Sequence, residues 1–535
     1  MNDLPAIKVE SIQKPFDEDA KASLGGALRS YVSTRRWFRA KTKTISEIQI
    51  ADVIDFPKVP AFLLILQIRY AAADTDRYLL PVSVGSFSEE WSEEPIARLF
   101  DDKAEVFVVN ALTSERFHQE LLHSVICESA LAGQDGVLQF SRTSSLTEKC
   151  QNAAPELKSF VSRAEQSNTS IIFGDRYILK LFRKLEDGIN PDVEIGQVLT
   201  ERGFKNTPAV LGSVIYRSRG QSSATGILQQ FVKNTGDAWA FTLASLETFF
   251  RDALAAGRKP PRLPHEHPLD LIGQNVPEDL RSFAGSYLES AALLGQRTAE
   301  MHAALTDPQA GPDFVPEQFT SVHARELHRS LVAQANSAFD LLRSKLPALE
   351  GQSAEAAREL LHLEDEIGKR FAAVEHMPVT AVRIRHHGDY HLGQVLYTGD
   401  DFMIIDFEGE PARPLAERRA KALAMRDVAG MVRSFQYAAF AALFGETPQL
   451  PSSPEGRGAV EAWAEQWNAY VSAQYLQSYF QHAHGLPFLS STSGEQRALL
   501  DAFLLQKALY ELGYELNNRP AWLLIPLRGI LSLIR

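Results

Sequence analysis

The spacing of apolar residues divides this chain into three stretches of different character. In the first hundred residues, a helical pattern at Ala20–Val32 is followed by segments that alternate or run apolar between turn residues, as strands do. These predicted strands are Ile45–Ile54, Phe62–Ala71 and Arg77–Val84. The first stretch is therefore predicted to be a small α+β unit.

The second stretch is rich in predicted strands and holds one helix. Its strands are Ser170–Phe173, Arg176–Phe182, Val210–Arg217 and Gly226–Val232. Gly174-Asp175 is a favourable hairpin pair between the first two strands. Asn190 as N-cap and Pro191 at the first helical position begin a helix that ends at Gly203. The pattern predicts a β-rich lobe with one embedded helix.

After Gly236 the pattern becomes helical, with apolar residues three and four positions apart. The first predicted helices are Trp239–Ala256, Leu280–Leu305, Val322–Lys345 and Ala354–Val374. A short β interlude at Val395–Phe407 follows, and helices resume from Arg413 around an exposed Pro-rich linker, Glu446–Pro454. We therefore predict an α+β fold with three domains: a cap (1–105), a β-rich lobe (106–235) and a helical lobe (236–535).

Composition narrows the class of protein. A length of 535 residues exceeds what one hydrophobic core supports, and 45% hydrophobic with 23% charged residues is ordinary for a soluble fold. The net charge of −12 argues against nucleic acid or an anionic membrane as partner. No export signal is visible in residues 1–21, no apolar run could span a bilayer, and there are two cysteines. We expect a cytoplasmic protein.

The chemistry is concentrated in Arg385–Glu408. Phosphoryl transfer needs one carboxylate to orient or deprotonate the acceptor hydroxyl and another to hold Mg²⁺ against the nucleotide phosphates. Asp389 is suited to the first role, and Gln394, five residues later, offers an amide oxygen to the metal. Asp406 follows a tight hairpin that returns the chain to the same place. Protein kinases have this order, with Asn where Gln394 stands here.

Two other interpretations of this stretch remain open. Asp389 is also a common turn residue after glycine, and Asp406 could simply end a strand. His386, His387 and His391 could instead bind zinc, because histidines four positions apart share a helix face. No further Cys, His or carboxylate ligand is evidently paired with these histidines, which disfavours zinc.

The second stretch offers the nucleotide contacts. Lys180 interrupts an apolar strand, as the lysine that grips the α/β-phosphates of ATP does in kinases. Glu194 is the expected partner of this lysine, and Asp192 is assigned to the helix dipole. The alternative is that Lys180 lies at a solvated edge with its aliphatic stem buried.

Kinases cover the phosphates with a glycine-rich loop, but the equivalent segment here, Glu165–Ser170, has no glycine. Its amides and hydroxyls, at Ser167, Asn168 and Thr169, could still bind phosphate, or the segment is an ordinary polar loop. Gln230 and Val232 lie where a hinge backbone would meet the adenine edge. A P-loop kinase is disfavoured because GxxxxGK[ST] is missing.

With these residues assembled, the chain resembles bacterial maltokinases, relatives of the aminoglycoside phosphotransferases. The matching strings are Arg36–Phe38, Ser167–Ser170, Gln230-Phe231, Gly236–Trp239, His387–Gln394, Asp406–Pro411, Lys421, Arg426–Met431, Arg433–Phe435, Lys507–Glu511 and Asn518–Trp522. The Gly-Gln form of the catalytic loop and the string Asp406–Pro411 are more specific than the general kinase signature. The similarity covers nearly the whole chain.

That resemblance implies a bilobal protein-kinase-like fold with a β-rich N-lobe, a large helical C-lobe and an additional N-terminal α+β cap. It implies transfer of the ATP γ-phosphate to the anomeric hydroxyl of maltose, with Mg²⁺ as cofactor and trehalose synthase as a partner in α-glucan synthesis. Relatives of the family phosphorylate glucosamine instead. Glu408 is an expected accessory metal ligand, and the expected acceptor contacts are His391, Arg426 and Glu511. A nucleotide-binding pseudokinase is the alternative from another class.

Overall fold

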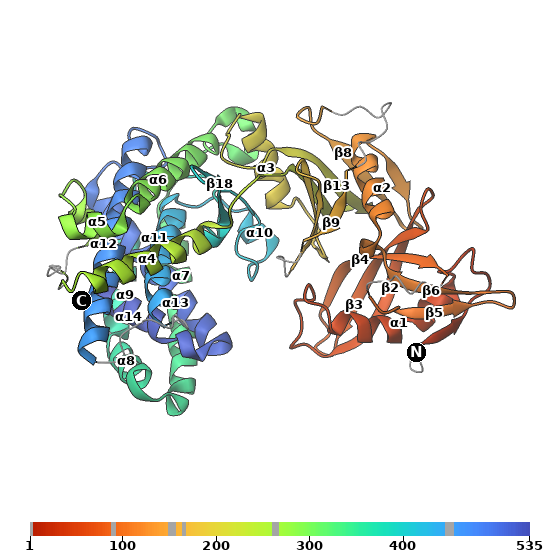
Figure 1. The fold of residues 1–535 in the computed structure, drawn as a ribbon, viewed down its shortest axis with the longest axis horizontal. Helices are drawn as coiled ribbons and strands as arrows, with labels where there is room; N and C mark the ends of the chain where they lie inside the picture. Colours follow the sequence, from red (N-terminus) through yellow and green to blue (C-terminus); the bar gives the residue numbers. More distant parts are fainter. Residues whose placement is uncertain are drawn as a thin grey trace. The chain divides into compact units, whose positions relative to one another are not determined.

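The computed structural model describes residues 4–86, 93–147, 157–162, 167–258, 260, 267–444 and 454–534. The chain divides into two compact units. The first comprises Met1–Thr200 and Pro208–Lys233, and the second comprises Glu201–Thr207 and Asn234–Arg535. In Figure 1 the first unit runs from red to yellow and the second from green to blue. Each unit is described by itself.

The first unit contains two sheets. The cap sheet has the strand order β1-β5-β6-β4-β3-β2, and β12 pairs with β4. Its strands are β1 (Ala6–Lys8), β2 (Ile45–Phe56), β3 (Ala61–Tyr70), β4 (Thr75–Gly85), β5 (Ala97–Phe100), β6 (Glu105–Asn110) and β12 (Lys184–Leu185). Helix α1 (Glu18–Ser33) begins after Asp17, whose side chain accepts a hydrogen bond from the N–H of Ala20. Its apolar face, including Leu24 and Leu28, packs against this sheet.

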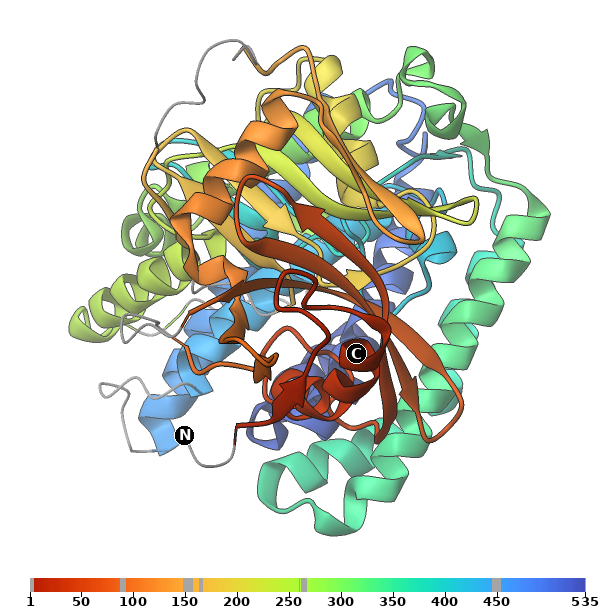
Figure 2. The same ribbon diagram turned by 90° about the vertical axis from the view of Figure 1, so that its right-hand side faces the viewer.

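The second sheet of this unit is the kinase-like sheet, with the order β7-β8-β13-β14-β11-β10-β9. Its strands are β7 (Ala130–Ala132), β8 (Gly136–Arg142), β9 (Ser159–Val161), β10 (Thr169–Phe173), β11 (Tyr177–Leu181), β13 (Val210–Ser218) and β14 (Gln221–Gln230). Helix α2 (Glu115–Ile126) packs against β8, β9 and β13 (Figure 2). Leucines of α2 share one core with residues of both sheets, so the cap and the kinase-like sheet form a continuous body.

A buried carboxylate ties these two sheets together. Asp52 of β2 is fully buried, and its Oδ1 accepts hydrogen bonds from the N–H groups of Gln134 (2.6 Å) and Asp135 (3.2 Å) in the turn before β8. The hydroxyl of Tyr216 on β13 donates to Oδ2 at 2.7 Å. A Cβ on Gly133 would lie 2.5 Å from this carboxylate, so the turn needs glycine there.

The second unit is mainly helical. Its helices are α4 (Ala238–Ala255), α5 (Glu278–Ala284), α6 (Tyr287–Ala304), α7 (Ser321–Lys345), α8 (Gly351–His362), α9 (Glu364–His376), α10 (Leu415–Arg418), α11 (Met425–Phe444), α12 (Pro454–Ala483), α13 (Ser493–Asn518) and α14 (Leu524–Ile534). Two strand pairs accompany them: β15 (Glu317–Gln318) with β16 (Val382–Arg383), and β17 (Val395–Tyr397) with β18 (Phe402–Ile404). Helices α6 and α12 pack closely because Gly295 has no side chain. A Cβ at this position would collide with the carbonyl of Tyr475.

Two predicted helices are each divided in the structure. The predicted helix Leu280–Leu305 is split into α5 and α6, because Gly285 adopts a φ of +54° that no α-helix accommodates. The predicted helix Ala354–Val374 breaks at Leu363 between α8 and α9. Most of the predicted linker Glu446–Pro454 lies outside the described residues.

Candidate active site

Asp427, near the start of α11, binds the backbone of the loop that carries Asp389. The N–H groups of His387 and Gly388 donate to Oδ2 and Oδ1 of Asp427 at 2.7 and 3.0 Å. His302 of α6 lies 3.2 Å from the same carboxylate. Burial alone would raise the pKa of Asp427, but the neighbouring histidines hold it well below the usual value. An ionised buried carboxylate therefore orients the loop backbone.

Asp389 itself is paired with a cation. Its Oδ1 lies 3.0 Å from Nζ of Lys507 on α13, and its Oδ2 lies 3.9 Å from Nε2 of His391. Burial would raise the pKa of Asp389, but Lys507 and His391 outweigh it and lower the pKa to about 2. The side chain is thus a carboxylate at neutral pH, able to accept a hydrogen bond from a hydroxyl.

Asp406 follows β18 in an unusual backbone conformation, with a φ of +64°. A non-glycine residue in this region is strained, and such residues cluster at functional sites. The strain is held by neighbours: the His387 Nε2 lies 2.9 Å from the carbonyl of Ile405, and its ring packs 4.9 Å from that of Phe407. The N–H of Ile405 donates to the carbonyl of Gln394 at 3.0 Å. The hairpin therefore returns the chain beside the Asp389 loop, as the sequence predicts.

The tip of this hairpin is anchored to α6. Arg297 binds both carboxylate oxygens of Asp401, with Nε–Oδ1 at 2.9 Å and Nη2–Oδ2 at 2.8 Å. Asn206 donates to the carbonyl of Phe402 at 2.9 Å. A bidentate arginine restricts the orientation of its partner more than a single bond does. The strand that leads to Asp406 is thereby fixed at both edges.

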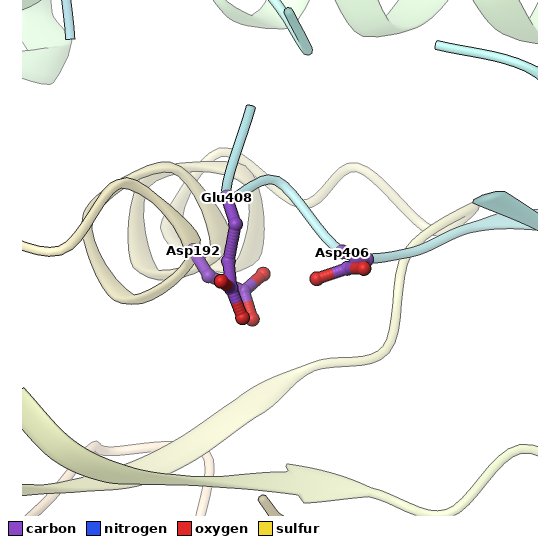
Figure 3. A group of neighbouring side chains, drawn as sticks. All are labelled: Asp192, Asp406 and Glu408. Carbon is purple, nitrogen blue, oxygen red and sulfur yellow. The ribbon is translucent and has the colours of Figure 1, made fainter. Parts of the chain in front are cut away.

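Two carboxylates after β18 could hold a metal ion. Figure 3 shows Asp406 and Glu408 on this segment, with an oxygen of each within 4.8 Å of the other. Oxygen ligands in such a pair suit Mg²⁺, a hard cation that is usually bound by one or two carboxylates. Gln394, the predicted amide ligand, ends a short 3-10 helix (Leu392–Gln394) directly before β17. The donor set of this unit fits Mg²⁺.

Asp389 lines a cavity within the second unit that contains about 420 Å³ of empty space, part of it open to solvent. Other lining residues with polar side chains are Gln334, Glu410, Arg413, Arg426, Asp427, Gln506, Lys507 and Tyr510. Glu410 lies 2.7 Å from Arg413 and 3.7 Å from Arg426. Of the three predicted acceptor contacts, Arg426 therefore lines the same cavity as Asp389.

The other two predicted acceptor contacts have structural partners. Nδ1 of His391 accepts a hydrogen bond from the N–H of Gly393 at 3.1 Å. Burial lowers the pKa of His391, while Asp389 and Asp406 both act to raise it, which places both carboxylates near one imidazole. Glu511 is paired with the buried Arg433, one turn beyond Lys507 on α13, and is not among the cavity-lining residues. A role for Glu511 at the acceptor is thus not favoured by its position.

The zinc alternative finds no support in the described residues. His387 and His391 direct ring nitrogens to backbone groups. Both ring nitrogens of His386 are buried without a hydrogen-bond partner, and burial lowers its pKa to about 3. None of the three histidines belongs to a group of metal-ligating side chains in the described part of the chain.

In the first unit, Lys180 of β11 forms an ion pair with Asp192 of helix α3 (Pro191–Glu201), with Nζ–Oδ2 at 3.2 Å. Asn190 caps this helix, since its Oδ1 accepts from the N–H of Asp192 at 2.8 Å. Asp192, in the first turn of this helix, is nearly fully buried, and Figure 3 shows it on the helix. Its place in the first turn agrees with the predicted helix-dipole role, and it is in addition a counter-ion of Lys180, which was not predicted. Glu194 lies further along α3, and its role stays a prediction.

The register of β10 and β11 separates the predicted phosphate contacts. Ser170 lies opposite Lys180, and Thr169 lies opposite Leu181. Because side chains alternate between the faces of a sheet, Thr169 points away from the face of Lys180. Its hydroxyl accepts a hydrogen bond from Nε of Arg183 at 2.9 Å, so only its backbone remains a candidate for nucleotide binding. Ser167 and Asn168 precede β10, and Glu165 and Gln166 lie outside the described residues.

The predicted hinge follows β14, which ends at Gln230. The N–H of Gln230 donates to the carbonyl of Ala209 at 2.9 Å, and the N–H of Phe231 donates to the carbonyl of Arg176 at 2.8 Å. These two donors are therefore used within the unit. Contacts of the Gln230 carbonyl and of Val232 with the base stay predictions.

Comparison with known proteins gives a consistent result. Residues 31–112 match the model of the maltokinase N-terminal cap domain. Two curated relatives are named glucosamine kinase. That of Mycolicibacterium smegmatis is 25% identical over 364 residues, which cover 68% of this chain and 76% of that protein. That of Streptacidiphilus jiangxiensis is 23% identical over 366 residues, which cover 68% and 70%.

Solved structures of glucosamine kinase are similar over nearly the full length. One has a TM-score of 0.60 at 18% identity and covers 93% of this chain and 94% of its own. A complex with glucosamine, ADP and inorganic phosphate has a TM-score of 0.60 at 17% identity and covers 95% and 99%. This chain has the glucosamine kinase fold. The predicted fold class, an α+β kinase-like fold with a β-rich lobe, a helical lobe and an N-terminal cap, is confirmed.

Two findings concern the environment of the protein. Among the described residues, no helix combines the length and apolar character that crossing a membrane requires. Cys127, which directly follows α2, is disulfide-bonded.

Proposed function

We propose that this protein is an ATP-dependent sugar kinase and that maltose is its acceptor. One observation carries the proposal: Asp389 lies on a rigidly held loop at a cavity, and Asp406 returns beside that loop at the end of a hairpin. This arrangement serves phosphoryl transfer, which depends on positioning and on compensating charge. The similarity to the maltokinase cap and to glucosamine kinases supports the same reaction class.

Asp389 orients the acceptor hydroxyl for in-line attack on the γ-phosphorus of ATP. As the new P–O bond forms and the bond to ADP breaks, the hydroxyl proton passes to Asp389. A pKa of about 2 makes this carboxylate a weak base. Its first contribution is therefore to accept a hydrogen bond and fix the direction of attack, and it takes the proton only as the hydroxyl becomes acidic.

Several groups of residues are proposed to bind the nucleotide. Lys180, with Asp192 as counter-ion, is proposed to bind the α/β-phosphates, and Ser167, Asn168 and the backbone of Thr169 to meet the terminal phosphates. Gln230 and Val232 would contact the adenine. Asp406, Glu408 and Gln394 would hold Mg²⁺, which neutralises charge on the transferring phosphoryl group.

The charges of the acceptor cavity support a neutral sugar. Each lining carboxylate already has a partner: Asp389 has Lys507, Glu410 has Arg413, and Asp427 has His302 and the loop amides. An amino sugar brings an ammonium group that needs a carboxylate of its own. Maltose has no charged group, and its hydroxyl groups can be bound by Arg426, Gln506 and the other polar side chains of the lining. Glucosamine is the second candidate, because the curated relatives carry that name.

An acceptor screen tests the proposal. The protein is incubated with ATP, Mg²⁺ and either maltose, glucose or glucosamine, and ³¹P NMR identifies the product and its position. We expect maltose 1-phosphate as the main product. Phosphorylation of glucosamine but not of maltose would support the proposed kinase activity and show that glucosamine, not maltose, is the acceptor. No ADP formation with any sugar would overturn the proposal and favour a pseudokinase.

Three further expectations belong to this proposal. The division into a cap (1–105), a β-rich lobe (106–235) and a helical lobe (236–535) remains our proposed domain description. Association with trehalose synthase would deliver maltose to this enzyme, and co-purification of the two tests it. A cytoplasmic location agrees with a need for ATP, and fractionation of cells tests that.

A further inference from the structure

The first unit contains a second cavity, between the cap sheet and the kinase-like sheet. It contains about 1480 Å³ of empty space that opens to solvent. Residues that line it include Arg35, Arg36 and Trp37 after α1, His118 on α2, Thr169 on β10, and Arg183 after β11. Of the roles proposed above, only those of Asn168 and of the Thr169 backbone concern residues of this lining.

The cavity lies on the opposite face of the kinase-like sheet from Lys180. Thr169 pairs with Leu181, and Ser170 pairs with Lys180, so these two rows point to opposite faces. Leu181 belongs to the core that the kinase-like sheet shares with the cap sheet. Arg183 is joined to the row of Thr169 by its hydrogen bond. A ligand in this cavity would therefore be separated by the sheet from the phosphates that Lys180 binds.

Arg183 is a buried cation that forms no ion pair with a carboxylate of the described residues. Its side chain is 2% exposed, and its hydrogen bonds go to neutral oxygens, Oγ1 of Thr169 at 2.9 Å and the carbonyl of Leu79 at 3.3 Å. Its guanidinium lies 5.0 Å from the ring centre of Trp37. Burial lowers the pKa of Arg183 to about 10, although Tyr31 and Glu93 act to raise it.

The carboxylates around the cavity do not supply the missing partner. Glu93 is already occupied by Arg35 at 3.3 Å, by the hydroxyl of Tyr31 at 3.4 Å and by the amide of Asn110. Glu115 lies exposed at the first turn of α2. Among the described residues of the lining, three arginines thus face two glutamates, and one of these glutamates already contacts Arg35, Tyr31 and Asn110.

Two more groups of the lining have unused hydrogen-bond donors. Nε of Arg35 is buried without a hydrogen-bond partner, and Arg36 is exposed and forms no ion pair with a described residue. His118 adds no charge, because its ring is bonded to Ser159 and Leu112 and burial lowers its pKa. The excess charge of the cavity is therefore carried by guanidinium groups alone.

We propose that this cavity binds a small organic phosphate, whose phosphate group is held between Arg183 and Arg36. Guanidinium groups match phosphate oxygens in pairs, and a dianion would compensate the buried charge. The cavity exceeds the size of one phosphate, so the rest of the ligand would lie along Trp37. Thr169 joins this cavity to the strand before Lys180, so occupancy can alter ATP binding. The proposal does not depend on the sugar acceptor.

Binding is measured by calorimetry with the full chain, using inorganic phosphate and glucose 6-phosphate as probes at constant ionic strength. We expect saturable binding of glucose 6-phosphate, weakened at least about tenfold by Arg36→Gln and by Arg183→Gln, since each removes a charged hydrogen bond. Lys180→Gln, on the other face of the sheet, and Arg116→Gln, exposed on α2 outside the lining, should bind as the wild type does. Arg36 is exposed, so its replacement tests the site even if Arg183→Gln fails to fold.

Each outcome decides the proposal. Weaker binding in the Arg36→Gln variant with normal binding in Lys180→Gln supports it, whichever of the two probes binds more tightly. Binding lost in Lys180→Gln and kept in Arg36→Gln would place the phosphate at the nucleotide site and overturn it. No saturable binding of either probe at millimolar concentration would overturn it as well.

Discussion

Nζ of Lys507 lies 3.0 Å from Oδ1 of Asp389, and the two side chains are 25% and 18% exposed. The pair joins α13 to the loop before β17, so the proposed acceptor-orienting carboxylate has a cation of its own. Burial lowers the pKa of Lys507, but Asp389, Glu511 and Glu410 together outweigh it and raise the pKa. Lysine and aspartate therefore keep each other charged, and the behaviour of the site with pH depends on both.

Replacing Lys507 by methionine should shift the pH dependence of the reaction. Burial, the largest influence on Asp389, would then act against less opposing charge, so the pKa of Asp389 would rise from about 2. Protonated Asp389 cannot accept the hydroxyl proton, and activity is lost as pH falls through its pKa. We expect the acidic limb of kcat/KM to move upward by about one to three pH units.

Lys421→Met is the matched control for this experiment, because Lys421 pairs with Glu317 and does not line the acceptor cavity. Its pH profile should keep the position of the wild type. An unmoved acidic limb in Lys507→Met would show that Lys507 does not set the charge of Asp389.

Replacing Asp427 by asparagine should misplace the catalytic loop. In asparagine an NH₂ group replaces one of the two carboxylate oxygens that accept from His387 and Gly388. This NH₂ group would face a backbone N–H and repel it. We expect kcat to fall on the order of 10²-fold, as for a misplaced reacting group, while ATP affinity is kept. Steady-state kinetics with the active fraction counted by ATP binding measures this. The surface variant Asp252→Asn should be unaffected, and an unchanged kcat in Asp427→Asn would exclude the positioning role.

The counter-ion of Lys180 can be assigned by comparing two variants of α3. Asp192→Asn leaves the buried Lys180 without the carboxylate 3.2 Å away, and the KM for ATP should rise roughly tenfold, as for one lost charged hydrogen bond. Glu194→Gln should have a smaller effect, because Glu194 is less buried. The reverse order of the two KM values would restore Glu194 as the principal partner.

Replacing Asp52 by alanine should loosen the cap. The hydroxyl of Tyr216 and the N–H groups of Gln134 and Asp135 would lose their acceptor, which costs roughly 2–4 kcal/mol of unfolding free energy. Denaturant unfolding of the full chain measures the loss. Asp55→Ala, at an exposed position of the same strand, should change the free energy by less than about 1 kcal/mol. Equal effects of the two substitutions would contradict this.

Local signals were sufficient to predict the loop and the hairpin of the site. Asp389, Gln394 and Asp406 occur in one short stretch with turn residues between them, and the structure brings the backbone of Gln394 against that of Ile405. The fold class followed from the change of apolar spacing along the chain. The break between α5 and α6 at Gly285 was not predicted, because a glycine within an apolar helical pattern does not by itself indicate a positive φ.

Residues that depend on tertiary contacts could not be found in this way. Lys507 is separated from Asp389 by 118 positions, and its place on α13 has no special spacing. Asp192 and Glu194 both lie in the first turn of α3, and only the approach of that helix to β11 decides which one meets Lys180. Whether Thr169 or Ser170 shares the face of Lys180 depends on the register between β10 and β11. The polar loop before β10 contains no glycine that would indicate this register from the sequence.

The phosphoryl-transfer account is tested most directly by the turnover of Asp389→Asn with ATP, Mg²⁺ and the sugar that gives the most product. Asparagine keeps the size of the side chain and removes the proton acceptor. The account predicts that the variant binds ATP as the wild type does and transfers phosphate about 10²–10⁴ times more slowly. Turnover within a few-fold of the wild type would contradict it.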